Sequence, residues 1–129
     1  MVRVIVVLSA LVTHHQAASA ATTPTKPGVL TENDKIEALI DAIERLPGAR
    51  FVRNDKEYDG PAAAKHLRSK WTWQRSSIKT ARDFIRLAAT SSSQTGRPYL
   101  IRFADGRVMK SADFLGNELD RLEGKGPGK

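Results

Sequence analysis

One histidine, one lysine and a run of serines are the residues of this sequence whose types and spacing could do chemistry. His66 and Lys70 are four residues apart, which makes them neighbours on one face of a helix. Residues 91–93 are serines in a loop that ends at a glycine. If this loop packs beside the helix, its hydroxyls, its N–H groups and Lys70 could hold a phosphate or carboxylate. The candidate ligand-binding residues are His66, Arg68, Lys70, Ser91, Ser92, Ser93 and Gly96.

The same residues also have a purely structural interpretation. His66 could bond a backbone carbonyl, while the alkyl chain of Lys70 covers the core with its charge in water. Arg68 lies at the opposite edge of the helix face that carries Leu67 and Trp71. Both interpretations of this cluster stay open.

Catalysis needs more than this pattern provides. A serine nucleophile from residues 91–93 would need His66 as its base and Asp59 or Asp83 to orient the imidazole. No G-x-S-x-G turn surrounds these serines. A zinc site is not expected, because the chain has no cysteine and only one histidine after residue 20. The pattern favours a noncatalytic site without a cofactor, with a serine hydrolase as the lesser alternative.

Residues 1–20 have the pattern of an export signal. Arg3 is followed by a nonpolar run, residues 4–12, and by Ala18-Ser19-Ala20, the small residues that a signal peptidase accepts. The run is too short to span a bilayer, since nine residues at about 1.5 Å each cannot cross about 30 Å; a core strand is the alternative. We predict cleavage after Ala20, periplasmic residence and no transmembrane segment in the mature chain.

The charge is unevenly distributed along the chain. After residue 20 the chain carries 20 Lys or Arg against 14 Asp or Glu. Residues 31–60 hold eight acids and five bases, whereas residues 65–107 hold ten bases and two acids. These charges are either solvated or paired between the two halves, or they form a surface for an anionic partner. For an exported protein we expect an anionic envelope component or another envelope protein as partner, and no nucleic acid.

The first half of the expected domain contains a helix, a hairpin and a second helix. Thr31 with Asp34 resembles a capping box, and the nonpolar residues that follow it, spaced by three and four, predict a helix that ends at Pro47. Residues 50–58 predict a hairpin around Asn54-Asp55-Lys56. Asp59 should cap the next helix, with Ala63, Leu67 and Trp71 buried, before a connection at residues 72–77; Trp73 should be exposed.

The second half repeats this order. Thr80 with Asp83 predicts another helix start, residues 98–103 and 107–110 predict a hairpin around Asp105-Gly106, and Ser111 should cap the last helix. A shift of 49 residues places Thr31 on Thr80, which suggests two related halves. The predicted fold is α+β: a small, mostly antiparallel sheet from two hairpins packed against about four helices. The predicted domain is residues 31–123, between a flexible lead-in, residues 21–30, and a disordered tail, residues 124–129.

Several short motifs lie between residues 51 and 103: Phe51-Val52-Arg53-Asn54, His66-Leu67-Arg68, Lys70, Ile78, Thr80-Ala81, Phe84-Ile85, Ser91-Ser92-Ser93, Gly96, Pro98 and Tyr99. Together they resemble the YfeK-like family, small exported proteobacterial proteins of unknown function. The resemblance implies periplasmic residence and one small domain, and it brings no catalytic assignment. From the resemblance and the charge pattern, we expect a noncatalytic binding or interaction module.

Overall fold

The computed structural model describes residues 28–125. The predicted export signal, residues 1–20, lies outside the described part of the chain, as do residues 21–27 of the predicted lead-in and residues 126–129 of the predicted tail. The elements follow one another as α1 (Glu32–Glu44), β1 (Arg50–Arg53), β2 (Lys56–Tyr58), α2 (Gly60–Trp73), α3 (Ala81–Ala88), β3 (Leu100–Arg102), β4 (Val108–Lys110) and α4 (Ser111–Leu122). The α+β class predicted from the sequence is confirmed.

Local sequence signals explain where α1 and α3 begin. The Thr31 side chain accepts a hydrogen bond from the N–H of Asp34, and the Asp34 carboxylate accepts one from the N–H of Thr31. Thr80 and Asp83 form the same reciprocal pair at the start of α3. Each pair satisfies N–H groups that have no partner inside the helix. Both predicted capping boxes are therefore confirmed.

The two hairpins form one four-stranded antiparallel sheet in the order β2-β1-β3-β4. Phe51 is opposite Tyr58 on one side and Ile101 on the other, so the two hairpins join through β1 and β3. The turn between β1 and β2 places Asn54 and Asp55 at φ values of 50° and 64°. Asn and Asp tolerate this left-handed conformation, which a tight hairpin turn of two residues requires.

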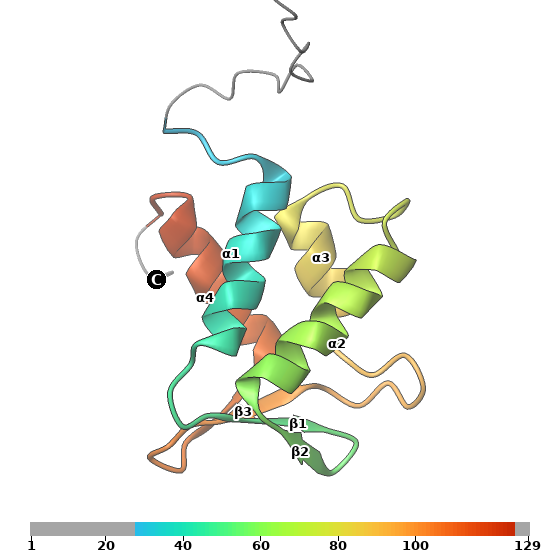
Figure 1. The fold of residues 1–129 in the computed structure, drawn as a ribbon, viewed down its shortest axis with the longest axis vertical. Coiled ribbons are helices and arrows are strands. Elements are labelled where there is room, and N and C mark those ends of the chain that lie inside the picture. The colour runs from blue at the N-terminus through green and yellow to red at the C-terminus, as the bar shows by residue number, and fades with distance from the viewer. Residues whose placement is uncertain (1–27, 126–129) are drawn as a thin grey trace, which may run out of the picture.

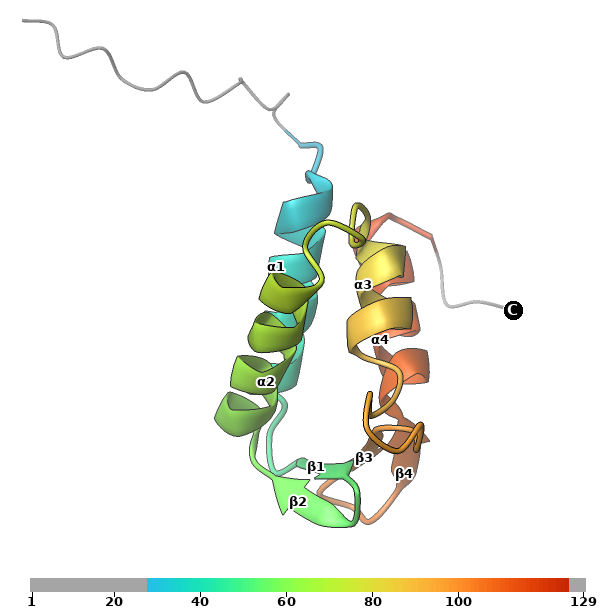
Figure 2. The ribbon, with the colours of Figure 1, turned by 90° about the vertical axis from the view of Figure 1, so that its right-hand side faces the viewer.

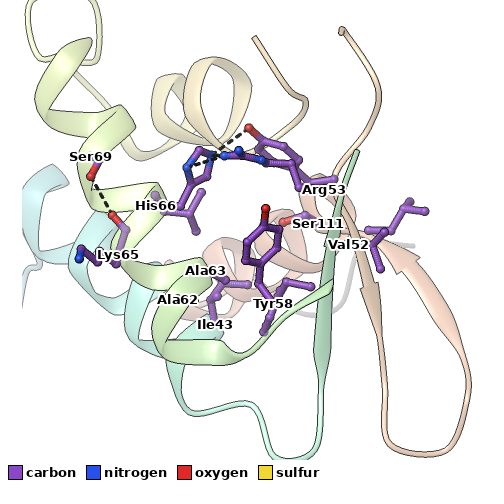
Figure 3. Close-up of a pocket in the computed structure, with 14 residues that line it drawn as sticks. Ile43, Val52, Arg53, Tyr58, Ala62, Ala63, Lys65, His66, Ser69 and Ser111 are labelled. Atoms are coloured by element: carbon purple, nitrogen blue, oxygen red, sulfur yellow. Dashed lines mark hydrogen bonds between the residues drawn. The ribbon is translucent and has the colours of Figure 1, made fainter. Parts of the chain in front are cut away.

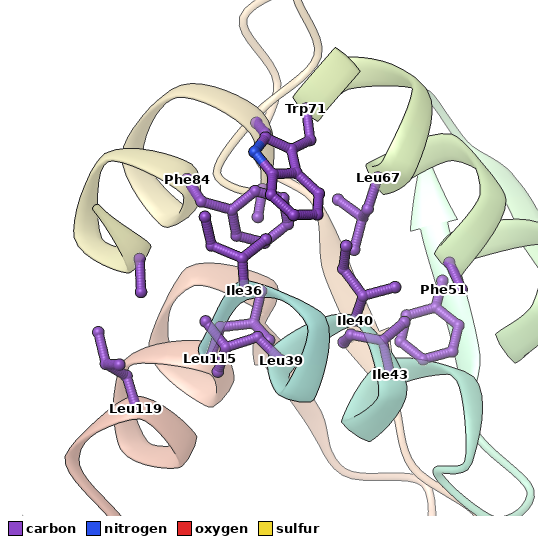
Figure 4. Close-up of a cluster of buried hydrophobic side chains, with 14 of the residues drawn as sticks. Ile36, Leu39, Ile40, Ile43, Phe51, Leu67, Trp71, Phe84, Leu115 and Leu119 are labelled. Atoms are coloured by element: carbon purple, nitrogen blue, oxygen red, sulfur yellow. The ribbon is translucent and has the colours of Figure 1, made fainter. Parts of the chain in front are cut away.

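The helices stand on the sheet as two pairs. In Figure 2, α1 and α2 lie on one side, α3 and α4 on the other, and the strands run across the lower end of both pairs. Figure 1 shows the same sheet below the helices. A single hydrophobic core fills the space between the pairs, and Trp71 meets Phe84 edge to face with ring centroids 6.3 Å apart. Figure 4 labels the largest core side chains: Ile36, Leu39, Ile40, Ile43, Phe51, Leu67, Trp71, Phe84, Leu115 and Leu119.

Two details of the sequence prediction were wrong, and one was incomplete. The connection predicted at residues 72–77 starts later, because α2 continues to Trp73 and the Thr72 hydroxyl donates to the carbonyl of Arg68. Ala63 packs partly buried against the core, as predicted, but Ala64, which the prediction left out, is the most buried alanine of α2. Ser111 does not cap α4: Lys110 holds the cap position, and Ser111 is the buried first helical residue because β4 leads directly into the helix.

Gly60 marks the closest approach between two helices. A Cβ atom at this position would fall well inside van der Waals contact of the Glu44 carbonyl oxygen. The start of α2 can therefore lie against the end of α1 only because residue 60 has no side chain. This contact orients α2 over β1 and β2.

The 49-residue shift suggested that the two halves of the chain are related, and this relation stays a prediction.

Candidate anion-binding site

His66 lies partly buried on α2 and faces the first strand of the sheet. The Nη1 atom of Arg53 is 2.8 Å from Nδ1 and 3.0 Å from Nε2 of the imidazole. The Nε2 atom is also 3.1 Å from the hydroxyl of Tyr99. Figure 3 shows Arg53 reaching from β1 to His66, with Tyr58 of β2 beside them. Side chains 13 and 33 positions away along the chain therefore meet at this histidine.

Lys70 joins the same cluster one helical turn later. Its Nζ donates to the Tyr99 hydroxyl at 3.1 Å and to the Ser91 carbonyl at 3.0 Å. The spacing predicted that His66 and Lys70 would be neighbours, and the Tyr99 hydroxyl lies within 3.1 Å of both side chains. We refer to Arg53, His66, Lys70 and Tyr99 as the Arg53 cluster.

The Arg53 cluster has more hydrogen-bond donors than acceptors. An unprotonated Nδ1 of His66 can accept from Arg53, which leaves the Nε2–H to donate to Tyr99. The Tyr99 oxygen then accepts from both His66 and Lys70, and its own O–H is free to donate. The Nε of Arg53 is buried and has no partner among the described residues. Only an added acceptor could use these donors.

Burial and the two cations hold the imidazole in its neutral form. The pKa of His66 falls from 6.5 to about 4, first because burial penalises the charged form and then because Arg53 and Lys70 repel a further positive charge. Burial and Arg53 also lower the pKa of Lys70. Burial raises the pKa of Tyr99, although Arg53 opposes that shift. At neutral pH the cluster is therefore cationic through Arg53 and Lys70.

An apolar pocket of about 310 Å³ opens beside the Arg53 cluster. It lies between the first half of α2 and strands β1 and β2, and Figure 3 draws the side chains that line it. Arg53, His66 and Tyr99 form its polar end. Its remaining wall is mainly apolar and includes Ile43, Phe51, Tyr58, Ala62, Ala63 and Leu67.

The serine loop lies next to the cluster. Most of its hydrogen bonds, however, fix the loop in place and do not reach the cluster. Ser92 is buried, and its hydroxyl accepts from the Asn54 side chain at 3.1 Å. The Gly96 N–H donates to the Ser92 carbonyl at 2.8 Å, within the loop. Ser93 and Gly96 are exposed. Ser91 reaches the cluster through its backbone carbonyl, so the binding role predicted for the three serines and Gly96 stays a prediction.

Arg68 lies on another side of α2 and does not join the cluster. Its guanidinium pairs with Glu37 at 2.7 Å and with Asp41 at 3.3 Å on α1. Similar ion pairs neutralise six of the ten basic side chains between residues 65 and 107: Arg68, Arg82, Arg86, Arg97, Arg102 and Arg107.

Much of the positive charge of residues 65–107 is paired with acidic side chains of other segments. Such pairing is one of the two alternatives that the sequence left open. Arg97, in the loop before β3, binds Asp55 in the turn between β1 and β2, and Arg102 of β3 binds Glu57 of β2. Isolated surface pairs of this kind contribute only about 0–1 kcal/mol each. They nevertheless leave fewer cations free to meet a partner. Among the described residues, those of this stretch without a carboxylate partner are Lys65, Lys70, Arg75 and Lys79, three of them on or next to α2.

Within residues 28–125 no group of three or more histidine, cysteine or acidic side chains is placed to hold a metal ion. No helix in that range combines the length and the apolar character that crossing a bilayer needs.

Trp73 is 87% exposed, as its position two residues after Trp71 predicted.

Arg53 and Tyr99 are site residues that the sequence analysis did not select. The alternation of a strand could have identified Arg53, because residues two apart face the same side and Phe51 is buried. An arginine on the inner face of a strand needs a partner. Tyr99 follows Pro98 and comes just before β3, and no local signal indicated that its hydroxyl would reach α2.

Comparisons with known proteins identify a family without a known activity. A stretch of 68 residues, 53% of this chain, is 40% identical to a Salmonella typhimurium protein named "Uncharacterized protein YfeK". The chain spans 57% of the length of that relative. This similarity confirms the resemblance stated from the sequence. No solved structure matches the chain. Residues 30–123 match the family of unknown function DUF5329, to which the chain therefore belongs.

Proposed function

We propose that this protein is an exported, noncatalytic binding module that holds an anionic group of an envelope component at the Arg53 cluster. The observation that carries the proposal is the buried Nε of Arg53, which has no acceptor. A buried donor without a partner costs about 1–3 kcal/mol. A carboxylate or phosphate would provide that acceptor and would match the charge of Arg53 and Lys70. The planar guanidinium favours such forked acceptors.

The surroundings of His66 support binding rather than serine hydrolysis. A general base works best with a pKa near the operating pH, and the pKa of His66 is about 4. Its ring nitrogens contact Arg53 and Tyr99, while the Ser92 hydroxyl bonds Asn54 and the N–H of Gln94. The described residues thus provide no hydrogen bond between the imidazole and a serine hydroxyl. The hydrolase is accordingly the weaker alternative.

Titration of the purified protein with sodium acetate and with inorganic phosphate tests the proposal. We expect the NMR signals of the Arg53 side chain and the Tyr99 ring to shift saturably, and the affinity to fall as ionic strength rises. Arg53→Met should abolish the shifts, whereas Arg86→Met, an exposed arginine paired with Asp83 in its own helix, should leave them unchanged. If neither anion perturbs Arg53 or Tyr99, the binding proposal is wrong.

Export is a separate part of the proposal and has its own test. It rests on the signal pattern of residues 1–20. Expression of the full chain in a proteobacterium, followed by fractionation and mass spectrometry, should yield a periplasmic product that begins at Ala21. Recovery of the uncleaved chain from the cytosol would reject export and leave the binding site untouched.

A further inference from the structure

We propose that the ligand of this site is a small amphipathic anion: one short alkyl chain with a carboxylate or phosphate head. This inference rests on the proposed function and adds that the bound anion carries an alkyl chain. The head would bind the donors of the Arg53 cluster, and the alkyl chain would fill the apolar pocket beside it.

The pocket wall and the cluster are continuous. Arg53, His66 and Tyr99 line the same pocket as the side chains of Ile43 and Leu67. Tyr58 connects the two ends, because its ring lies in the wall while the Arg53 guanidinium carbon lies 5.7 Å from its centroid. Pockets for small molecules combine a mostly apolar lining with a few convergent polar groups. A ligand here would bind in one orientation, with its polar end at the Arg53 cluster and its apolar end against the pocket wall.

Charge determines which amphipathic molecules fit. Arg53 has no carboxylate partner among the described residues, and Lys65, which also lines the pocket, has none either. An amine head would meet these cations at short range and would be repelled. A neutral alcohol could accept a hydrogen bond from one of the donors but would not neutralise the positive charge of these side chains. An anionic head satisfies both conditions.

The size of the pocket limits the chain. Its 310 Å³ is at the lower end of the range of about 300–1,000 Å³ for small-molecule sites. At about 30 Å³ for each group the size of a water molecule, that volume holds roughly ten such groups. A single chain of about eight carbons with its head fits this space, whereas the two acyl chains of a phospholipid do not.

A chain-length series tests the inference on the purified protein. Calorimetric titration with acetate, butanoate, hexanoate and octanoate should show the affinity rise by about fourfold for each added CH₂, because each buried CH₂ contributes about 0.8 kcal/mol. The gain should stop once the pocket is full. Octyl phosphate tests the second head group, and octanol, which lacks the charge, should bind much more weakly than octanoate.

A variant of the pocket wall provides the structural control. Ala63 is partly buried on α2 and lines the pocket, so Ala63→Leu should remove the dependence on chain length while acetate still shifts the Arg53 signals. Ala38→Leu adds the same side chain on α1, outside the pocket, and should leave the whole series unchanged. Thermal unfolding of both variants establishes that they are folded.

The outcomes separate this inference from the proposed function. Acetate binding with an affinity that does not change along the series would overturn the amphipathic ligand and keep the anion site. No binding of any anion, or octanol binding as tightly as octanoate, would overturn the proposed function as well. A peptide with an apolar C-terminal residue that outcompetes octanoate would replace the alkyl chain with a protein partner and overturn the inference.

Discussion

The guanidinium of Arg53 lies 2.8 Å from the Nδ1 atom of His66, so a permanent cation contacts the one imidazole of the described residues. This contact joins the first strand of the sheet to the second helix. After burial, this contact is the second cause of the lowered pKa that keeps the imidazole neutral, because a protonated ring would place two cations in contact. The first two predictions follow from this relationship.

We predict that protonation of His66 destabilises the folded protein in mild acid. Its pKa is about 4 in the folded state and 6.5 in an unfolded chain, so the unfolded state binds more protons between these values. The contribution of the neutral imidazole to the free energy of unfolding is fully present above pH 6.5 and is lost as the pH falls to about 4. Urea unfolding over this range should therefore show a steeper loss for the wild type than for His66→Gln. Parallel curves for the two proteins would contradict the prediction.

Arg53→Met should raise the pKa of His66. Arg53 is the second cause of the low value, after burial, so the variant should titrate above pH 4 but below pH 6.5. The chemical shift of the His66 ring protons against pH measures this directly. Arg86→Met removes an equal charge at an exposed site in another helix and should leave the His66 titration unchanged. An unchanged titration in Arg53→Met would show that burial and Lys70 set the value without Arg53.

Two glycine substitutions should have opposite effects on stability. Gly60→Ala would force a methyl group against the Glu44 carbonyl, and we expect a loss of about 1–3 kcal/mol, typical of overpacking. Gly116→Ala, inside α4 with open space around its Cβ position, should gain about 0.5–1 kcal/mol through helix propensity. Denaturant unfolding compares the two directly. A Gly60→Ala protein as stable as the wild type would mean that α1 and α2 can separate at no cost.

The two tryptophans should differ sharply in their contribution to stability. Trp71 is 8% exposed and packs on Phe84, so Trp71→Ala should cost about 3–5 kcal/mol. Trp73 is 87% exposed, and Trp73→Ala should change the unfolding free energy by less than about 0.5 kcal/mol. Equal losses in the two variants would place Trp73 in a contact that the described residues do not contain.

The order of the elements followed from local signals in the sequence. The pairs Thr31–Asp34 and Thr80–Asp83 mark where helices begin through local contacts alone, because they satisfy the first N–H groups of their own helix. Asn54 and Asp55 specify a tight turn for a similarly local reason. The wrong details, such as the cap predicted at Ser111, occur where one element leads directly into the next and no turn separates them.

The sequence by itself determined the starts of α1 and α3, the hairpin turns and the neighbouring positions of His66 and Lys70, since each depends on residues a few positions apart. Only the tertiary structure decided that Arg53 and Tyr99 would surround His66, that Arg68 would instead pair with α1, and that an apolar pocket would open beside them. These contacts join residues 13 to 33 positions apart along the chain. They depend on how the helices pack on the sheet, which residue spacing does not encode.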